Sequence, residues 1–231
     1  MKFELTAECK VVLGERLFRI RALESNVSLG VKVGDIGGWL EKKTNLDEFS
    51  DAWVAGNACV YGDACVSGDA WVYGDAWVSG NACVAGNAYV YGNACVSGDA
   101  WVSGDARVYG NARVSGDAWV AGNAWVSGNA CVAGNACVAG NAQVSGNAWV
   151  SCDKDVLCFK NTWSSGRWFT YTRSNKKWRV GCFYGTGGEL IKKAYADGEV
   201  SGKCYEATVR YVEAVEKAQK ENRGLCSSGL T

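Results

Sequence analysis

Residues 51–152 repeat one six-residue unit seventeen times without an insertion. The unit reads Asp or Asn, Ala, a variable residue, Val, a small residue or Tyr, and Gly; it begins at Asp51 and ends at Cys152, which replaces the last Gly. A short period held this strictly is typical of a solenoid, in which each unit buries its apolar side chains only against its neighbours. The repeat therefore predicts the architecture of nearly half the chain.

The alternation within the unit predicts which side chains point inward. Ala and Val stand two positions apart, so in an extended strand both face one side and the variable residue between them faces the other. Val is β-branched and suits a strand, whereas the Gly-Asx pair suits a turn because both residues tolerate positive φ. Pro is absent from the whole chain, as expected where nearly every backbone N–H donates. We expect an Ala/Val interior and a turn at every sixth residue.

The unit Val-x-Gly-Asx-Ala-x resembles the hexapeptide repeat of left-handed parallel β-helix proteins. In that family three hexapeptides form one triangular coil of about eighteen residues, which implies about 5.7 coils here. With the segments 34–40 and 179–186 on either side, the whole chain also resembles repeat proteins common in phage and prophage genomes, often labelled polymer-forming or transferase-like. The resemblance implies an all-β solenoid.

The segments before and after the repeat have a different pattern. Residues 1–50 alternate like a β-hairpin with a turn at residues 14–16, and we expect this segment to cap the first coil because an open strand edge invites aggregation. Residues 153–231 contain three apolar stretches that predict strands and then apolar residues three or four apart that predict a helix over about residues 203–221. We therefore expect a C-terminal α+β module. The predicted strands cover residues 156–159, 168–172 and 178–183.

Composition limits the function classes. The formal net charge is zero, with the repeat at −5 and residues 153–231 at +5, so the chain lacks the basic stripe of a duplex nucleic-acid binder. No apolar stretch is long enough to span a bilayer, and residues 1–5 do not begin a signal peptide. We expect a cytoplasmic protein, located in the host cytoplasm if it is phage-encoded, with no membrane association.

A period of eighteen residues sorts the outward side chains into three faces. The first stacks Trp53, Trp71, Tyr89, Arg107, Trp125 and Gln143, with Tyr73, Tyr91 and Tyr109 one position further round; the second stacks Cys59, Trp77, Cys95, Arg113, Cys131 and Trp149; the third stacks Cys65, Cys83, Trp101, Trp119 and Cys137. So many outward aromatic residues form apolar patches larger than a soluble monomer usually exposes. We therefore expect a homo-oligomer.

The two arginines are the only charged residues in the variable position of the repeat. Arg107 is predicted to lie between Tyr89 and Trp125, and Arg113 on the adjacent face of the same coil. A guanidinium between aromatic rings can be a structural cation–π contact. It can also form half of a nucleotide site, with Arg on phosphate and an aromatic ring on the base. The candidate ligand-binding residues are Arg107, Arg113, Tyr89, Tyr91, Tyr109 and Trp125.

Other chemistry has weaker support in the sequence. Many left-handed β-helix proteins are acyltransferases that use a histidine as general base, and this chain contains no histidine. The cysteines in the variable position share it with Trp, Tyr, Arg and Gln, which favours apolar fillers over metal ligands, and we expect no cofactor. Residues 185–189 are rich in Gly but lack P-loop spacing, which favours a turn into a short helix.

We therefore expect a non-enzymatic binding or scaffold protein. By resemblance it would be phage-associated and would antagonise a host defence by binding a nucleotide signal or a host protein. Two alternatives stay open: a divergent hexapeptide-repeat acyl- or nucleotidyl-transferase, and a purely structural protein that assembles with itself.

Overall fold

The computed structural model describes residues 2–162 and 166–227. The chain folds into two compact units that meet in sequence between Cys158 and Phe159. The first unit contains the hairpin and the whole repeat and is joined by Thr172–Asn175, whereas the second contains most of the C-terminal segment.

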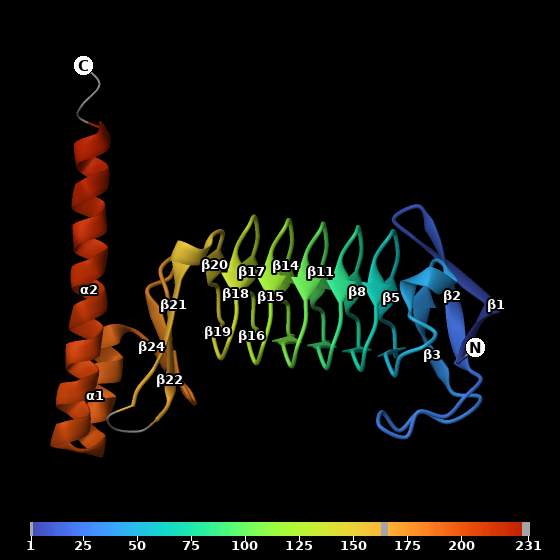
Figure 1. Ribbon diagram of the computed structural model, residues 1–231, viewed down its shortest axis with the longest axis horizontal. Helices are drawn as coiled ribbons and strands as arrows, with labels where there is room; N and C mark the ends of the chain where they lie inside the picture. The colour runs from blue at the N-terminus through green and yellow to red at the C-terminus, as the bar shows by residue number, and fades with distance from the viewer. Residues whose placement is uncertain (1, 163–165, 228–231) are drawn as a thin grey trace. The chain divides into compact units, whose positions relative to one another are not determined.

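Each repeat forms one two-residue strand made of the variable residue and Val. Strands three repeats apart pair in parallel, so Tyr89 lies in register with Trp71 on one side and Arg107 on the other. This spacing confirms the eighteen-residue coil and the three predicted faces, and the result is a parallel β-solenoid of about six turns (Figure 1). Its handedness stays a prediction from the resemblance.

The strands form three columns, one for each face. The first column contains β4 (Trp53–Val54), β7 (Trp71–Val72), β10 (Tyr89–Val90), β13 (Arg107–Val108), β16 (Trp125–Val126) and β19 (Gln143–Val144). The second contains β5 (Cys59–Val60), β8 (Trp77–Val78), β11 (Cys95–Val96), β14 (Arg113–Val114), β17 (Cys131–Val132) and β20 (Trp149–Val150). The third contains β6 (Cys65–Val66), β9 (Cys83–Val84), β12 (Trp101–Val102), β15 (Trp119–Val120) and β18 (Cys137–Val138).

The interior of the solenoid is built from the constant Ala and Val residues, as predicted. From Ala52 to Val150 each of these side chains is at most 1% exposed. Burying one Val side chain stabilises the folded chain by roughly 1.5–3 kcal/mol. The core is therefore a continuous column of small and β-branched side chains along the solenoid.

The corners are formed by the Gly-Asx pairs. Gly98 has φ +71°, and a Cβ at this position would lie 2.9 Å from the backbone N of Gly116 in the next coil. Asn and Asp side chains form hydrogen bonds between coils, as from Asn93 Nδ2 to Asn111 Oδ1 at 3.1 Å. A corner that is covered by the next coil, such as Gly98, therefore needs both the positive φ and the small size of Gly.

The N-terminal segment caps the solenoid by extending its second column. Strands β1 (Phe3–Val12) and β2 (Glu15–Ala22) form the predicted hairpin, and the positive φ values lie at Leu13 and Gly14, one residue earlier than predicted. The Gly-rich segment forms β3 (Ile36–Leu40), which pairs antiparallel with β2 and parallel with β5. The 3₁₀ helix η1 (Lys43–Asn45) follows, and Leu46 then bridges to Val66 of β6.

The repeat ends at η2 (Asp153–Asp155), a 3₁₀ turn. The Asp155 carboxylate accepts hydrogen bonds from the backbone N–H and hydroxyl of Ser151, both at 2.8 Å, and from the backbone N–H of Cys152 at 3.2 Å. Burial alone would raise the pKa of Asp155, but these donors outweigh burial and hold the pKa below its usual value. The ionised carboxylate therefore satisfies the backbone donors where the repeat stops.

The C-terminal segment has more elements than the sequence predicts. Strands β21 (Val156–Lys160), β22 (Trp168–Thr172), β23 (Lys177–Val180) and β24 (Phe183–Gly185) follow one another in one sheet. The prediction of a single strand over residues 178–183 is wrong, because Gly181 has φ +56° and turns the chain between β23 and β24.

Two helices follow this sheet, α1 (Gly187–Asp197) and α2 (Glu199–Ser227), so the predicted helix starts earlier and ends later than expected. Tyr205, Val209 and Val212 of α2 are buried within the second unit. The Tyr205 ring lies 4.9 Å from the Phe169 ring of β22, between centroids. This face of α2 therefore supplies part of the second unit's core.

Candidate functional site

The first outer face consists of two adjacent columns of aromatic side chains. One column comes from the variable position of strands β7, β10, β13 and β16; the other is the tyrosine column, Tyr73, Tyr91 and Tyr109, which follows the Val of the same repeats. The columns touch at both ends: the Trp71 and Tyr73 rings are 4.9 Å apart and the Tyr109 and Trp125 rings 6.4 Å apart, between centroids. The face is therefore an aromatic surface that is interrupted by Arg107 of β13.

The tyrosine column is a regular stack. Its neighbouring ring centroids lie 4.9 Å and 5.0 Å apart, and the ring planes are within 3° of parallel. Burial raises the pKa of Tyr73 and Tyr91 above the ordinary value for a tyrosine, and the positive charge of Arg107 partly opposes this rise. The hydroxyls of Tyr73 and Tyr91 thus remain protonated at neutral pH and can both donate and accept hydrogen bonds.

Arg107 lies in the column of variable residues, between the rings of Tyr89 and Trp125. Its Cζ is 5.5 Å from the Tyr89 ring centroid and 5.3 Å from the Trp125 ring centroid. Its side chain is exposed, and among the residues that the structure describes no carboxylate pairs with it. The two rings flank the guanidinium, and its exposed N–H groups can bind an anion.

The structure brings five of the six predicted residues together on the first outer face. The sixth, Arg113, lies in β14 between Cys95 and Cys131, on the second outer face, which agrees with the predicted register. It is exposed but has no aromatic neighbour among its strand partners. The two arginines therefore differ in their surroundings although they occupy the same position of the repeat.

A second cationic cluster lies at the cap and was missed in the sequence. Lys10 Nζ and Arg19 Cζ lie 4.4 Å and 4.7 Å from the Trp39 ring centroid. The Trp39 side chain is buried and in register with Cys59 of β5. Trp39 and Cys59 are twenty residues apart, so the eighteen-residue period gave no signal for this contact. Arg19 also donates to the Gly56 carbonyl at 2.8 Å, which ties the hairpin to the first coil.

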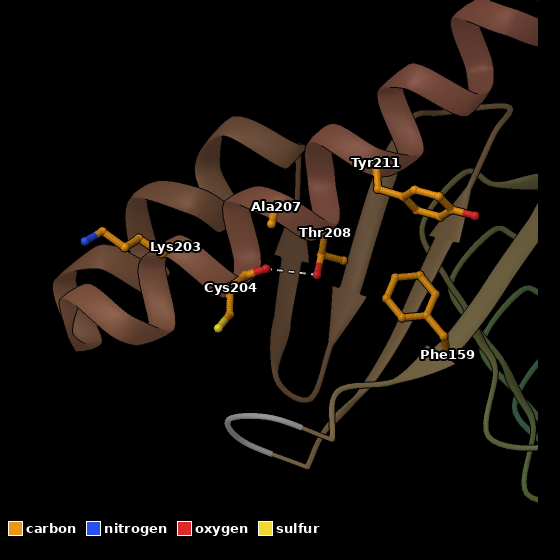
Figure 2. A pocket seen from close by; sticks show the side chains of 6 residues that line it. All are labelled: Phe159, Lys203, Cys204, Ala207, Thr208 and Tyr211. Atoms are coloured by element: carbon orange, nitrogen blue, oxygen red, sulfur yellow. Dashed lines mark hydrogen bonds between the residues drawn. The ribbon is translucent and has the colours of Figure 1, made fainter.

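The second unit contains an apolar groove of about 510 Å³ beside α2. It is lined by Phe159 of β21 and by Lys203, Cys204, Ala207, Thr208 and Tyr211 of α2 (Figure 2). The Thr208 hydroxyl donates to the Cys204 carbonyl at 2.9 Å, so the polar atom of Thr208 is already satisfied. The sequence analysis missed this groove, because it brings Phe159 together with residues of α2 that lie more than forty positions later in the chain.

Other candidate chemistry has little support in the described part of the chain. No group of three or more Cys, Asp or Glu side chains is placed to hold a metal ion there. The Gly-rich segment leads into α1, and Glu189 accepts hydrogen bonds from the backbone N–H and hydroxyl of Thr186 at 2.7 Å and 2.8 Å. This capping box places the chain's own carboxylate at the helix N-terminus, where a phosphate would otherwise bind. No described helix has the length and apolar character needed to cross a membrane.

Comparison with known proteins agrees with the repeat architecture. Residues 88–104 and 106–122 match the family model described as YdcK Beta solenoid repeat, and the chain is similar to that family over these residues. The matched stretches include Tyr89, Arg107 and Arg113. No curated protein matches the chain.

Proposed function

We propose that this protein is a non-enzymatic β-solenoid binding protein whose first outer face binds a small anionic ligand with a planar ring, such as a nucleotide. The observation that supports this proposal is the position of Arg107 between Tyr89 and Trp125 with no carboxylate partner in the described chain. An exposed, ring-held guanidinium loses little rotamer freedom when it binds, so more of its interaction energy contributes to affinity.

The surroundings of Arg107 fit one phosphate group better than a polyanion. The repeat as a whole carries a net charge of −5, and a negatively charged surface repels a long phosphate chain. A single guanidinium such as that of Arg107 can still pair with one phosphate group through two hydrogen bonds. The nearby tyrosine hydroxyls supply additional donors and acceptors, and the exposed edges of the aromatic rings supply apolar contact area. A mononucleotide or cyclic nucleotide has this combination of groups.

The biological role that we propose comes from the resemblance to phage and prophage repeat proteins. A phage-encoded binding protein in the host cytoplasm can antagonise a host defence by sequestering a nucleotide signal. Alternatively, the protein would antagonise a host defence by binding and blocking a host protein through the same aromatic face.

Ligand binding is tested by calorimetric titration and thermal unfolding with cyclic nucleotides and ADP-ribose derivatives. We expect one of them to stabilise the protein, and Arg107→Ala to weaken its affinity about 10- to 100-fold, as for loss of a charge-assisted hydrogen bond worth about 1.5–3 kcal/mol. Arg113→Ala is the matched control, because it removes the same charge from another face. Absence of binding by all compounds, or equal effects of the two substitutions, would contradict the proposal.

Two alternative functions make different predictions. A purely structural, self-assembling role is favoured by the exposed Trp101 and Trp119 of the third outer face, whose rings stack with centroids 5.8 Å apart. Trp101→Ser and Trp119→Ser together would then abolish assembly, as measured by light scattering. A divergent acyl- or nucleotidyl-transferase activity is supported only by the family resemblance. It predicts turnover of acyl-CoA or a nucleoside triphosphate in the presence of an acceptor.

A further inference from the structure

Helix α2 has two apolar faces, and only one of them is covered in the second unit. The covered face includes Tyr205, Val209 and Val212, all buried. The other face, which we call the α2 stripe, consists of Val200, Cys204, Ala207, Tyr211, Ala214 and Ala218. All of these residues are exposed except Cys204, which is half-buried, and Val200 and Tyr211 are 74% and 67% exposed. A soluble helix with a second apolar face of this length needs a second partner.

The spacing of the α2 stripe indicates what kind of partner fits. Its residues follow one another at intervals of four, three, four, three and four, which is the a/d spacing of a helix that packs against another helix. The stripe also forms one wall of the apolar groove, whose opposite side is formed by Phe159 (Figure 2). A side chain from a partner helix that crosses the stripe at Ala207 would enter this groove.

The stripe is complementary in size to a second copy of itself running in the opposite direction. An antiparallel pair related by a two-fold axis between Ala207 and Tyr211 places Val200 against Ala218, Cys204 against Ala214 and Ala207 against Tyr211 of the other copy. Every larger side chain then meets an alanine. An isologous contact of this kind contains each pair twice and closes as a dimer.

Charge does not oppose this contact. Lys203 beside the stripe pairs with Glu199 at 2.7 Å, and Arg210 pairs with Glu213 at 2.9 Å, in both cases within the same helix. Two of the cations that border the stripe are therefore already neutralised. The stripe runs over nineteen residues, from Val200 to Ala218, which is about 27 Å of helix. One helix pair of this length buries less area than the interface of a stable dimer. The association is therefore weak and depends on concentration.

We propose that the α2 stripe is a self-association surface, through which two copies of this chain pair antiparallel, with Tyr211 of each copy inserted beside Ala207 of the other. This surface consists of residues of the second unit, and the proposal does not depend on ligand binding at Arg107. It names an interface that the sequence alone did not predict.

The test uses sedimentation equilibrium of the full chain over a range of concentrations. We expect the dimer dissociation constant to rise about tenfold or more for Ala207→Tyr, which brings two tyrosines together, and for Tyr211→Ala, which leaves a gap. The double variant Ala207→Tyr with Tyr211→Ala restores the large-to-small pairing and should return to within about threefold of the unmodified protein. Ala196→Tyr, at an exposed position of α1, is the matched control and should have no effect.

A cross-linking experiment checks the orientation. After Ala214→Cys, mild oxidation should give a disulfide between Cys204 of one copy and the introduced cysteine of the other, identified by mass spectrometry of the linked peptides. A parallel pair would instead link Cys204 to Cys204 and would overturn the antiparallel arrangement. A chain that stays monomeric at all concentrations, or a dimer that Ala207→Tyr does not weaken, would overturn the proposal as a whole.

Discussion

The rings of Tyr73 and Tyr91 are stacked 4.9 Å apart between centroids with an angle of only 2° between their planes. This separation is close to the distance between neighbouring strands in a sheet, so the coil spacing itself positions the rings. The stack therefore follows from the backbone, and each ring contributes to the stability of the coils on both sides of it.

Tyr91 is the middle member of this stack and is expected to contribute most. Tyr91→Ala removes two ring contacts, each worth about 0.5–1.5 kcal/mol, and should lower the free energy of unfolding by about 1–3 kcal/mol. Tyr91→Phe keeps the ring and should change it by less than about 0.5 kcal/mol. Urea unfolding followed by tryptophan fluorescence measures both values, and equal losses for the two variants would show that the hydroxyl, and not the ring, provides the stability.

Glycine corners should differ in their tolerance of alanine according to the space above them. Gly98 and Gly140 have similar φ values of +71° and +65°, but a Cβ on Gly98 would lie 2.9 Å from Gly116 N, whereas nothing lies within 4 Å of one on Gly140. Both substitutions incur the left-handed backbone cost of about 1–2 kcal/mol. Gly98→Ala should cost clearly more in thermal unfolding, because it also forces two coils apart. Equal losses would mean that conformation alone selects Gly at these corners.

The side-chain amides of Asn93, Asn111, Asn129 and Asn147 form a chain of hydrogen bonds in which each amide donates to the next one along the sequence. Asn111 accepts from Asn93 and donates to Asn129 at 3.0 Å, whereas Asn147 accepts from Asn129. Asn111→Asp loses a donor and should lower the free energy of unfolding by about 0.5–1.5 kcal/mol. Asn147→Asp adds the same charge but keeps its bond, so it is the control and should have a smaller effect.

Acid should destabilise the end of the repeat through Asp155. Because folding lowers the pKa of this carboxyl, its contribution is complete above the unfolded-state pKa of about 3.9 and is lost as the pH falls through the lower folded-state pKa. Asp155→Asn should be less stable than the unmodified protein at neutral pH, and the difference should shrink below about pH 4. Thermal unfolding across this range measures it. Asp117→Asn, which removes an exposed corner carboxylate, should not reproduce the pattern.

The part of the fold that repeats could be predicted closely from the sequence. Period and register follow from the same six residues at every step, so Arg107 could be placed between Tyr89 and Trp125 before any coordinates. The contacts that were missed lie where the period fails. Trp39 joins the second column across a spacing of twenty residues, and the groove beside α2 depends on a contact between Phe159 and residues more than forty positions away. Neither of these contacts can be deduced from a local pattern of residues.

The in-register stacking of strands eighteen residues apart also limits how such a gene can change. Loss of a single six-residue unit between Tyr89 and Arg107 would rotate every later strand by one column. Arg113 would then lie beside Tyr89, with Cys131 above it, and the ring on the other side of the guanidinium would be gone. Loss or duplication of three units keeps each column in line. The smallest insertion or deletion that evolution can accept without rebuilding the surface is therefore a whole turn of the solenoid.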